Sequence, residues 1–210
     1  MESIGYYLTH PDAIIYVTAS ALLYPVLIAE VVALVFAVFE AGRFTAEMIQ
    51  RARKRHLSTI REAAERAQQA LDGGDADKAI EQLHVALGHP RYARRFAFAL
   101  TPGDLSRTHL LKLVNDTELD ASRRLERTRM LIRFGPILGL MGTLIPISPA
   151  LVALAQGDVQ TLSDNLVIAF STTVVGLLIG GIGYGVSTVR DRLYTQDMSD
   201  VEYALEILGV

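Results

Sequence analysis

Three long stretches with almost no charge constrain the fold of this 210-residue chain most strongly. No charged residue occurs from Phe134 to Gly157 or from Asn165 to Val189, and from Ala13 to Phe39 the one charged residue is Glu30. Each stretch exceeds the roughly 20 apolar residues that a helix needs to span a bilayer. The first stretch lacks a basic leader and a small-residue cleavage site, so we expect it to be retained. We predict transmembrane helices at residues 13–39, 134–157 and 165–189.

The basic residues predict the orientation of these helices, because positive charge near membrane ends stays cytoplasmic. Of the 20 lysines and arginines, 18 lie between Arg43 and Arg133, and the remaining two are Arg190 and Arg192. The segments 1–12 and 158–164 carry four acids and no Lys or Arg. We therefore expect a multi-pass protein of the cytoplasmic (inner) membrane, with its N-terminus outside and its C-terminus in the cytoplasm.

We predict that the segment 40–133 forms a helical cytoplasmic domain. Its helix formers are interrupted at Gly73 and Gly74, and no Gly or Pro occurs from Leu105 to Phe134. A helix that begins near Asp104 can therefore continue into the membrane, and residues 190–210 form a C-terminal cytoplasmic helix by the same apolar periodicity. The predicted fold class is an all-α integral membrane protein whose long helices extend into a helical cytoplasmic domain. Its basic clusters indicate topology and contact with anionic lipid rather than nucleic-acid binding.

Small residues recur at helical spacing in the second and third stretches. The second has a stripe of Gly135, Gly139, Gly142, Pro146 and Pro149, with Thr143 beside it, and the third has Asn165, Ala169, Thr172, Gly176, Gly180, Gly183 and Ser187, with Thr173 at its flank. Small residues allow helices to approach closely in lipid, so one interpretation is a tight bundle that conducts nothing. The added hydroxyls, including Ser171, and the carbonyls freed by proline favour a partly wet pore lining.

These two stretches resemble the MotA/TolQ/ExbB proton channel family. "GPILGLMGTL" is similar to the family's second-span pattern aPxLGLxGTV, and "AFSTTVVGLLIG" is similar to its third-span pattern ALxxTxxGLxxA. The resemblance covers about residues 130–195 and implies that Thr143 and Thr173 are the pore threonines. The chain departs from the family at Ile168, where energy-transducing members have a glutamate, and at Pro146 and Pro149, which suggest a locally bent second span.

The resemblance implies a homopentamer that surrounds a dimer of a single-span MotB/TolR/ExbD-like protein. That partner carries the aspartate that is protonated and released during ion passage, and the ring couples the ion flow to mechanical work as a motor or stator. Besides these two pore threonines, Thr143 and Thr173, the residue pattern itself places Thr172, Ser171, Pro146 and Asn165 in the ion path, with Gly135, Gly139, Gly142, Gly176 and Gly180 as small pore-lining residues. We expect protons rather than sodium, since the glycines offer no side-chain ligands.

Glu30 is the only Asp, Glu, Lys, Arg or His inside the three predicted spans. A charge in the bilayer core is costly and commonly marks function, so Glu30 is a candidate intramembrane acid. It either relays protons or is a neutral acid that bonds a neighbouring span or lies near a water-filled crevice beside Pro25. The sequence favours the second interpretation, because the first span of such rings lies outside the pore lining.

Enzyme chemistry finds no support in the sequence. The five histidines lack metal-binding spacing and there is no glycine loop of the phosphate-binding kind, so we expect no catalytic residue, no metal and no cofactor. The alternative to a motor subunit is a non-conducting membrane scaffold whose cytoplasmic helices recruit another protein. A small-molecule permease is less favoured, because three spans without an internal repeat do not fit that architecture.

Overall fold

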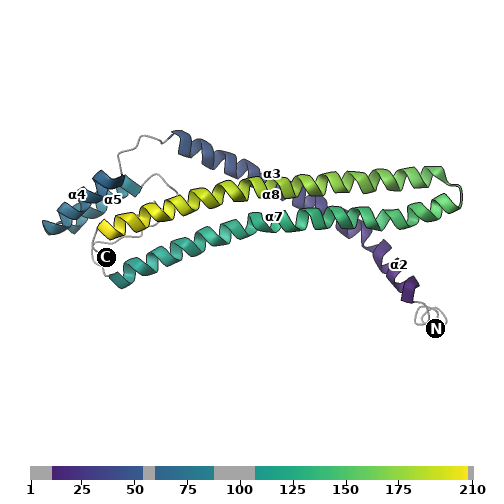
Figure 1. Cartoon of the computed structure of the whole chain (residues 1–210), viewed down its shortest axis with the longest axis horizontal. Coiled ribbons are helices and arrows are strands. Elements are labelled where there is room, and N and C mark those ends of the chain that lie inside the picture. Colours follow the sequence, from purple (N-terminus) through teal and green to yellow (C-terminus); the bar gives the residue numbers. More distant parts are fainter. Residues whose placement is uncertain (1–10, 54–59, 88–106, 208–210) are drawn as a thin grey trace. The chain divides into compact units, whose positions relative to one another are not determined.

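A computed structural model of the chain describes residues 11–53, 60–87 and 107–207, and these residues form α-helices without strands. Figure 1 shows their order along the chain. The helices are α2 (Pro11–Ala21), α3 (Leu23–Arg53), α4 (Ile60–Asp72), α5 (Ala76–Leu87), α7 (Arg107–Ala155) and α8 (Val159–Ile207). Three stretches are long and apolar enough to cross a membrane, at Val17–Ala52, Thr108–Ala155 and Val159–Tyr203. The predicted all-α class with three spanning helices is confirmed.

The first predicted span falls on two consecutive helices rather than one. The helical pattern is interrupted at Leu22, between α2 and α3, three residues before Pro25. A proline has no amide hydrogen, and its ring clashes with the carbonyl of the residue four positions earlier, which is Ala21. The interruption therefore has a local cause in the sequence.

The second and third spans each belong to one helix of 49 residues. α7 contains Pro136, Pro146 and Pro149 without losing its helical continuity. The predicted start of this helix near Asp104 lies outside the described residues, as do residues 1–10 of the outer N-terminal segment, residues 54–59 and 88–106 of the cytoplasmic domain, and residues 208–210.

A three-residue turn joins α7 to α8. Gly157 adopts φ +76°, a left-handed conformation that glycine takes without strain, and the Asp158 amide donates to the Ala153 carbonyl. Asp158 then caps α8, because its carboxylate accepts hydrogen bonds from the Thr161 amide at 3.0 Å and the Thr161 hydroxyl at 2.6 Å. The turn directs α8 back along α7 (Figure 1).

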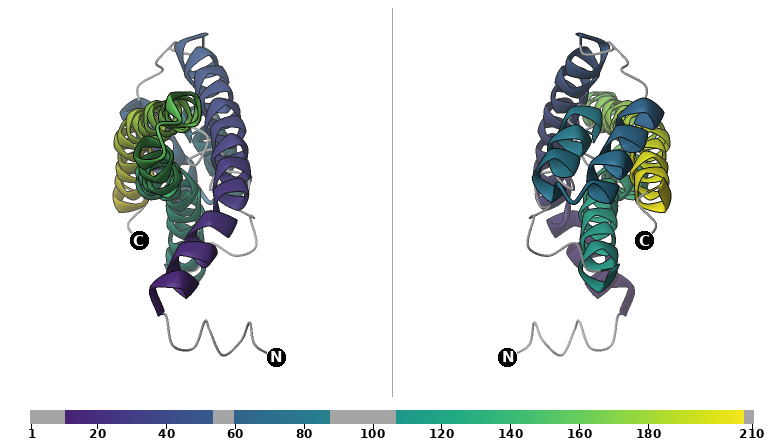
Figure 2. Two further views of the ribbon diagram at one scale, coloured as in Figure 1. Left: turned by 90° about the vertical axis from the view of Figure 1, so that its right-hand side faces the viewer. Right: turned by 90° about the vertical axis from the view of Figure 1, so that its left-hand side faces the viewer.

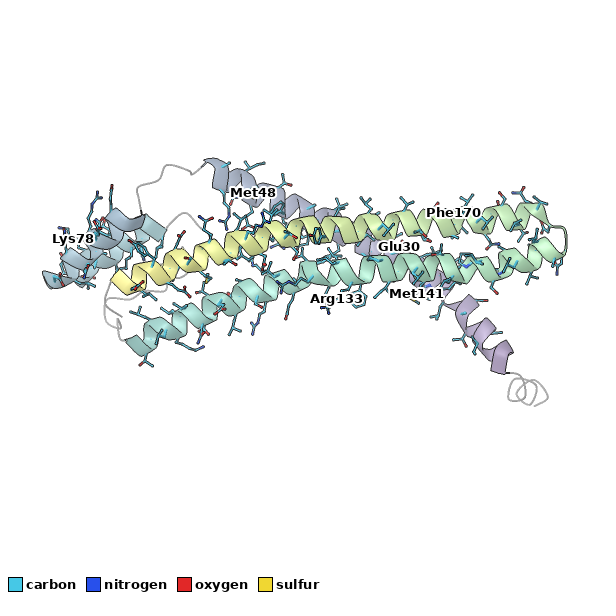
Figure 3. The ribbon with its side chains drawn as sticks, in the orientation of Figure 1. Glu30, Met48, Lys78, Arg133, Met141 and Phe170 are labelled. Atoms are coloured by element: carbon cyan, nitrogen blue, oxygen red, sulfur yellow. The ribbon has the colours of Figure 1, made fainter. Side chains whose placement is uncertain are left out.

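The chain divides into two units, the first of which comprises Met1–Ala41 and Thr128–Gly185. Its buried apolar cluster consists of Ala37, Leu131 and Ile179, one residue from each of α3, α7 and α8. Large apolar side chains such as Val32, Leu144 and Phe170 are exposed on the outside, and Phe170 points away from α8 in Figure 3. Such a surface suits lipid or other membrane helices rather than water.

The second unit comprises Gly42–Arg127 and Val186–Val210. Within it α4 and α5 form a helical hairpin (Figure 2), and Gly74, with φ +80°, closes α4 before Asp75 caps α5. The hairpin buries its apolar face against α7 and α8, in a cluster made of Ala67, Ala79, Ile80, Leu83, Leu87, Leu110, Val201 and Leu205. This unit therefore has a hydrophobic core of its own.

Candidate functional site

The two predicted pore threonines meet in the first unit. The Thr173 hydroxyl on α8 lies 3.4 Å from the Thr143 hydroxyl on α7. Each hydroxyl also donates to a carbonyl of its own helix, Thr143 to Gly139 at 2.7 Å and Thr173 to Ala169 at 3.1 Å. Both side chains are half-buried. The pair therefore offers neutral oxygen atoms that can accept further hydrogen bonds, from water or from a protonated acid.

The other predicted ion-path residues lie around this pair in different environments. Thr172 is buried and donates to the Ala169 carbonyl at 2.9 Å, whereas Ser171 is exposed and donates to the Val167 carbonyl at 2.7 Å. Asn165 is half-buried and donates to the Thr161 carbonyl at 2.8 Å, and Pro146 is buried. Three successive hydroxyl residues thus point in three directions, as helical geometry requires.

The small residues of the two stripes are in direct contact across α7 and α8. A Cβ atom added to Gly176 would lie 2.6 Å from the Gly135 carbonyl oxygen and 2.7 Å from the Gly139 Cα atom. A Cβ on Gly142 would lie 2.6 Å from the Cβ of Thr172, and one on Gly180 would lie 3.1 Å from the ring of Pro136. The two helices therefore approach as closely as they do only because these positions lack side chains.

These distances give Gly135, Gly139, Gly142, Gly176 and Gly180 a packing role within one chain. Each missing side chain is directed at the other helix of the same chain. Helix packing was one of the two interpretations of the stripes, and a pore-lining role for the same glycines stays a prediction.

Glu30 lies on α3 (Figure 3) and is buried, with 3% of its surface exposed. Gly176 on α8 lies beside its carboxyl group, and its Oε1 atom has no hydrogen-bond partner among the described residues. The side chain therefore points into the helix packing rather than into lipid. The sequence identified this acid but not its neighbour.

A second polar cluster, in the second unit, was not predicted from the sequence. Arg51 on α3 binds both carboxylate oxygens of Asp197 on α8 at 2.9 and 2.8 Å and lies 3.5 Å from Glu47. Arg190 lies 3.8 Å from Glu47 and stacks over the Phe44 ring at 5.8 Å. The spacing of Glu47 and Arg51 by four residues was the available signal, but it does not indicate which residues of α8 they meet.

No cluster of three or more His, Asp or Glu side chains suited to a metal ion occurs in residues 11–53, 60–87 and 107–207. Comparison with known proteins gives one match. A sequence model of the MotA/TolQ/ExbB proton channel family matches residues 94–201, a range that contains both threonines and all five glycines. The comparisons found no matching curated protein and no matching solved structure.

Proposed function

Because the chain belongs to the MotA/TolQ/ExbB proton channel family, we propose that it is a ring-forming subunit of a proton-driven motor or stator in the cytoplasmic membrane. Family membership by itself implies a membrane protein with the proton-channel function that is general to this family. The family generally works with MotB/TolR/ExbD-like partners. We propose further that five copies of the chain surround a dimer of such a single-span partner, which supplies the titrating aspartate.

The observation that carries the proposal is the hydroxyl pair of Thr143 and Thr173, 3.4 Å apart on the two helices that the family match covers. Threonine hydroxyls can also bond two packed membrane helices to each other, but an ion path specifically needs polar atoms that are not charged, and this pair supplies them. The half-buried position of both side chains leaves them accessible from one side of the helix pair.

A mechanism follows from the chemistry of these groups. The hydroxyls can hold water and the partner's carboxyl group in place without competing for the proton, because threonine does not titrate in this range. A dry environment favours the neutral acid and a wet one favours the carboxylate. Movement of the ring around the partner would alternate these two environments, so that proton passage and rotation occur together.

Protons are favoured over sodium by the scarcity of oxygen ligands. Sodium, a hard cation, requires several oxygen donors at once. The pair of Thr143 and Thr173 supplies only two side-chain oxygens, and the glycines of the two stripes supply none, because the space beside them is occupied by the opposing helix. Flux through the reconstituted complex tests this choice. A pH gradient in sodium-free buffer should drive flux. If flux strictly required sodium, the conducted ion would be sodium and not the proton, but the channel function would still hold.

A non-conducting scaffold remains the second candidate, and the tight glycine packing of α7 against α8 is the observation that favours it. Co-purification from the native membrane separates the two. A motor subunit brings down a single-span protein with one membrane aspartate, in a pentamer-to-dimer stoichiometry that native mass spectrometry measures. A ring that purifies without such a protein and leaves proton flux at the level of empty vesicles would identify the scaffold.

A further inference from the structure

Glu30 is a buried acid that the mechanism above does not use. Its surface is 3% exposed, and its Oε1 atom has no hydrogen-bond partner in the part of the chain that the structure describes. An isolated charge in hydrocarbon is unfavourable, and a membrane-buried acid that lacks a basic partner is normally kept for function. A purely structural acid would be expected to have both oxygens bonded.

The surroundings of Glu30 supply no charge to balance a carboxylate. The helices that pack against this part of α3 carry no charged residue from Phe134 to Gly157 or from Asn165 to Val189, and α3 has no other charged residue before Glu40. Within the described residues, the backbone of Gly176 on α8 lies beside the carboxyl group. Such surroundings favour the neutral acid over the carboxylate, and the acid can exchange its proton only if water reaches it.

Gly176 connects this acid to the threonine pair. Its missing side chain faces Gly135 and Gly139 of α7, and its backbone meets the Glu30 carboxyl group from α3. Gly176 follows Thr173 by three residues, which is about 4.5 Å along the helix axis. Along the axis of α8, the acid and the hydroxyl pair are therefore separated by about one helical turn or less.

From this juxtaposition we infer that Glu30 is a proton-binding site of this chain, which takes up and releases a proton during ion passage. The role of Glu30 in flux rests on the proposed channel function, whereas proton binding by Glu30 does not depend on that function. The ligand of Glu30 is the proton and not a metal cation, because a hard cation requires several oxygen ligands and the described residues contain no cluster of three or more acidic or histidine side chains that could hold one.

Proton binding is tested on the full chain alone, in phosphatidylcholine vesicles, with a hydrophobic carbodiimide. The acid proton moves to a carbodiimide nitrogen, the carboxylate oxygen bonds to the central carbon, and no group leaves. Mass spectrometry should locate the adduct on Glu30, with a yield that falls as the pH rises and does not change with sodium. Glu47, which is ion-paired to Arg51, is the internal control and should stay unmodified. Absence of the adduct at every pH, or protection by sodium, would overturn the inference.

The role in flux is tested with the partner present. Glu30→Gln keeps the shape but cannot exchange a proton, so proton flux should fall about tenfold or more while the ring still assembles. Glu30→Asp should keep part of the flux. Glu40→Gln, a change of the same kind at another buried acid of α3, is the matched control and should keep the full rate. Wild-type flux in Glu30→Gln would overturn the role, whereas a wild-type complex without flux would contradict the channel function and leave the carbodiimide result valid.

Discussion

Arg51 and Asp197 form a two-point ion pair in which Nη1 and Nη2 donate to Oδ1 and Oδ2 at 2.9 and 2.8 Å. The residues are 146 positions apart in the sequence, on α3 and α8, and Asp197 is 3% exposed. Paired hydrogen bonds between a guanidinium and a carboxylate fix both distance and orientation. The pair therefore holds these two helices together in the second unit.

Removal of one partner from this pair should be costly. Arg51→Ala takes the guanidinium from a buried carboxylate, and we expect it to lower the free energy of unfolding by about 3 kcal/mol. Arg66→Ala is the control, because Arg66 pairs with Glu62 at 3.5 Å on an exposed surface and should cost less than about 1 kcal/mol. Denaturant titration of the detergent-solubilised protein, followed by circular dichroism, measures both. Equal losses of unfolding free energy in the two variants would show that the buried ion pair stabilises the protein no more than the exposed one does.

A methyl group should separate α7 from α8 at Gly176. In Gly176→Ala the new Cβ would lie 2.6 to 2.9 Å from backbone atoms of Gly135 and Gly139, which cannot rotate away. We expect a loss of about 1–3 kcal/mol in stability, as for other overpacked contacts. Gly181→Ala adds the same methyl where no atom lies within 4 Å, so it should be neutral or stabilising. The melting temperatures of the two variants in detergent test this prediction. Equal melting temperatures for Gly176→Ala and Gly181→Ala would contradict the packing role of Gly176.

The sequence was sufficient to predict the class of the fold and its three membrane-spanning helices. Uncharged stretches of more than 20 residues leave few alternatives to membrane helices. The 4, 3 spacing of the glycines places them on one face of each helix, and these two faces contact each other in the structure. What spacing alone could not decide was whether a face meets another helix of the same chain or a pore, since both require small residues.

Pairings between distant residues were beyond the reach of sequence reasoning. Glu30 was recognised as an isolated acid, but nothing in its neighbourhood on the chain indicates Gly176, which lies on another helix. Arg51 and Asp197 are two of many charged residues in polar segments, and only the packing of α3 on α8 selects them. The interruption at Leu22 could have been predicted from Pro25, because the clash of a proline with the preceding turn is a local effect.

Loss of either hydroxyl of the threonine pair should impair ion passage and not folding. Thr143→Val and Thr173→Val remove one oxygen and add a methyl of similar size, so the helix packing is retained. With the partner present we expect proton flux to fall about fivefold or more, the equivalent of one hydrogen bond in the limiting step. Thr195→Val, which removes an exposed hydroxyl of α8 outside the predicted span, is the control. The ion-path assignment is wrong if both variants conduct like the control.

The predicted orientation can be measured because the chain has no cysteine. Single cysteines at Met1 or Asp158 should react with a membrane-impermeant maleimide in intact cells, because these positions are expected outside. Cysteines at Gly73 or Val210 should react only after the membrane is opened. The expectation follows from the restriction of all Lys and Arg to the segments predicted to be cytoplasmic. Labelling of the Gly73 position in intact cells would reverse the topology.

The cap of α8 should respond to pH in a predictable direction. Hydrogen bonds from the Thr161 side chain and amide hold the pKa of Asp158 below its ordinary value. A group whose pKa is lowered on folding stabilises the folded state above its unfolded pKa, and this contribution disappears as the pH falls through the folded pKa. The start of α8 should therefore loosen under acid conditions and not at neutral pH.

Thr161→Val tests the cause, because it removes the hydroxyl donor and should raise the pKa of Asp158 toward its ordinary value. The Asp158 carboxyl resonance, followed by NMR in detergent micelles, gives the pKa, and hydrogen exchange at the Thr161 amide reports the loosening. Ser163→Ala, a change at a nearby exposed position, is the control and should leave the titration as in the wild type. An Asp158 pKa that is the same in the wild type and in Thr161→Val would exclude the hydroxyl as the cause of the shift.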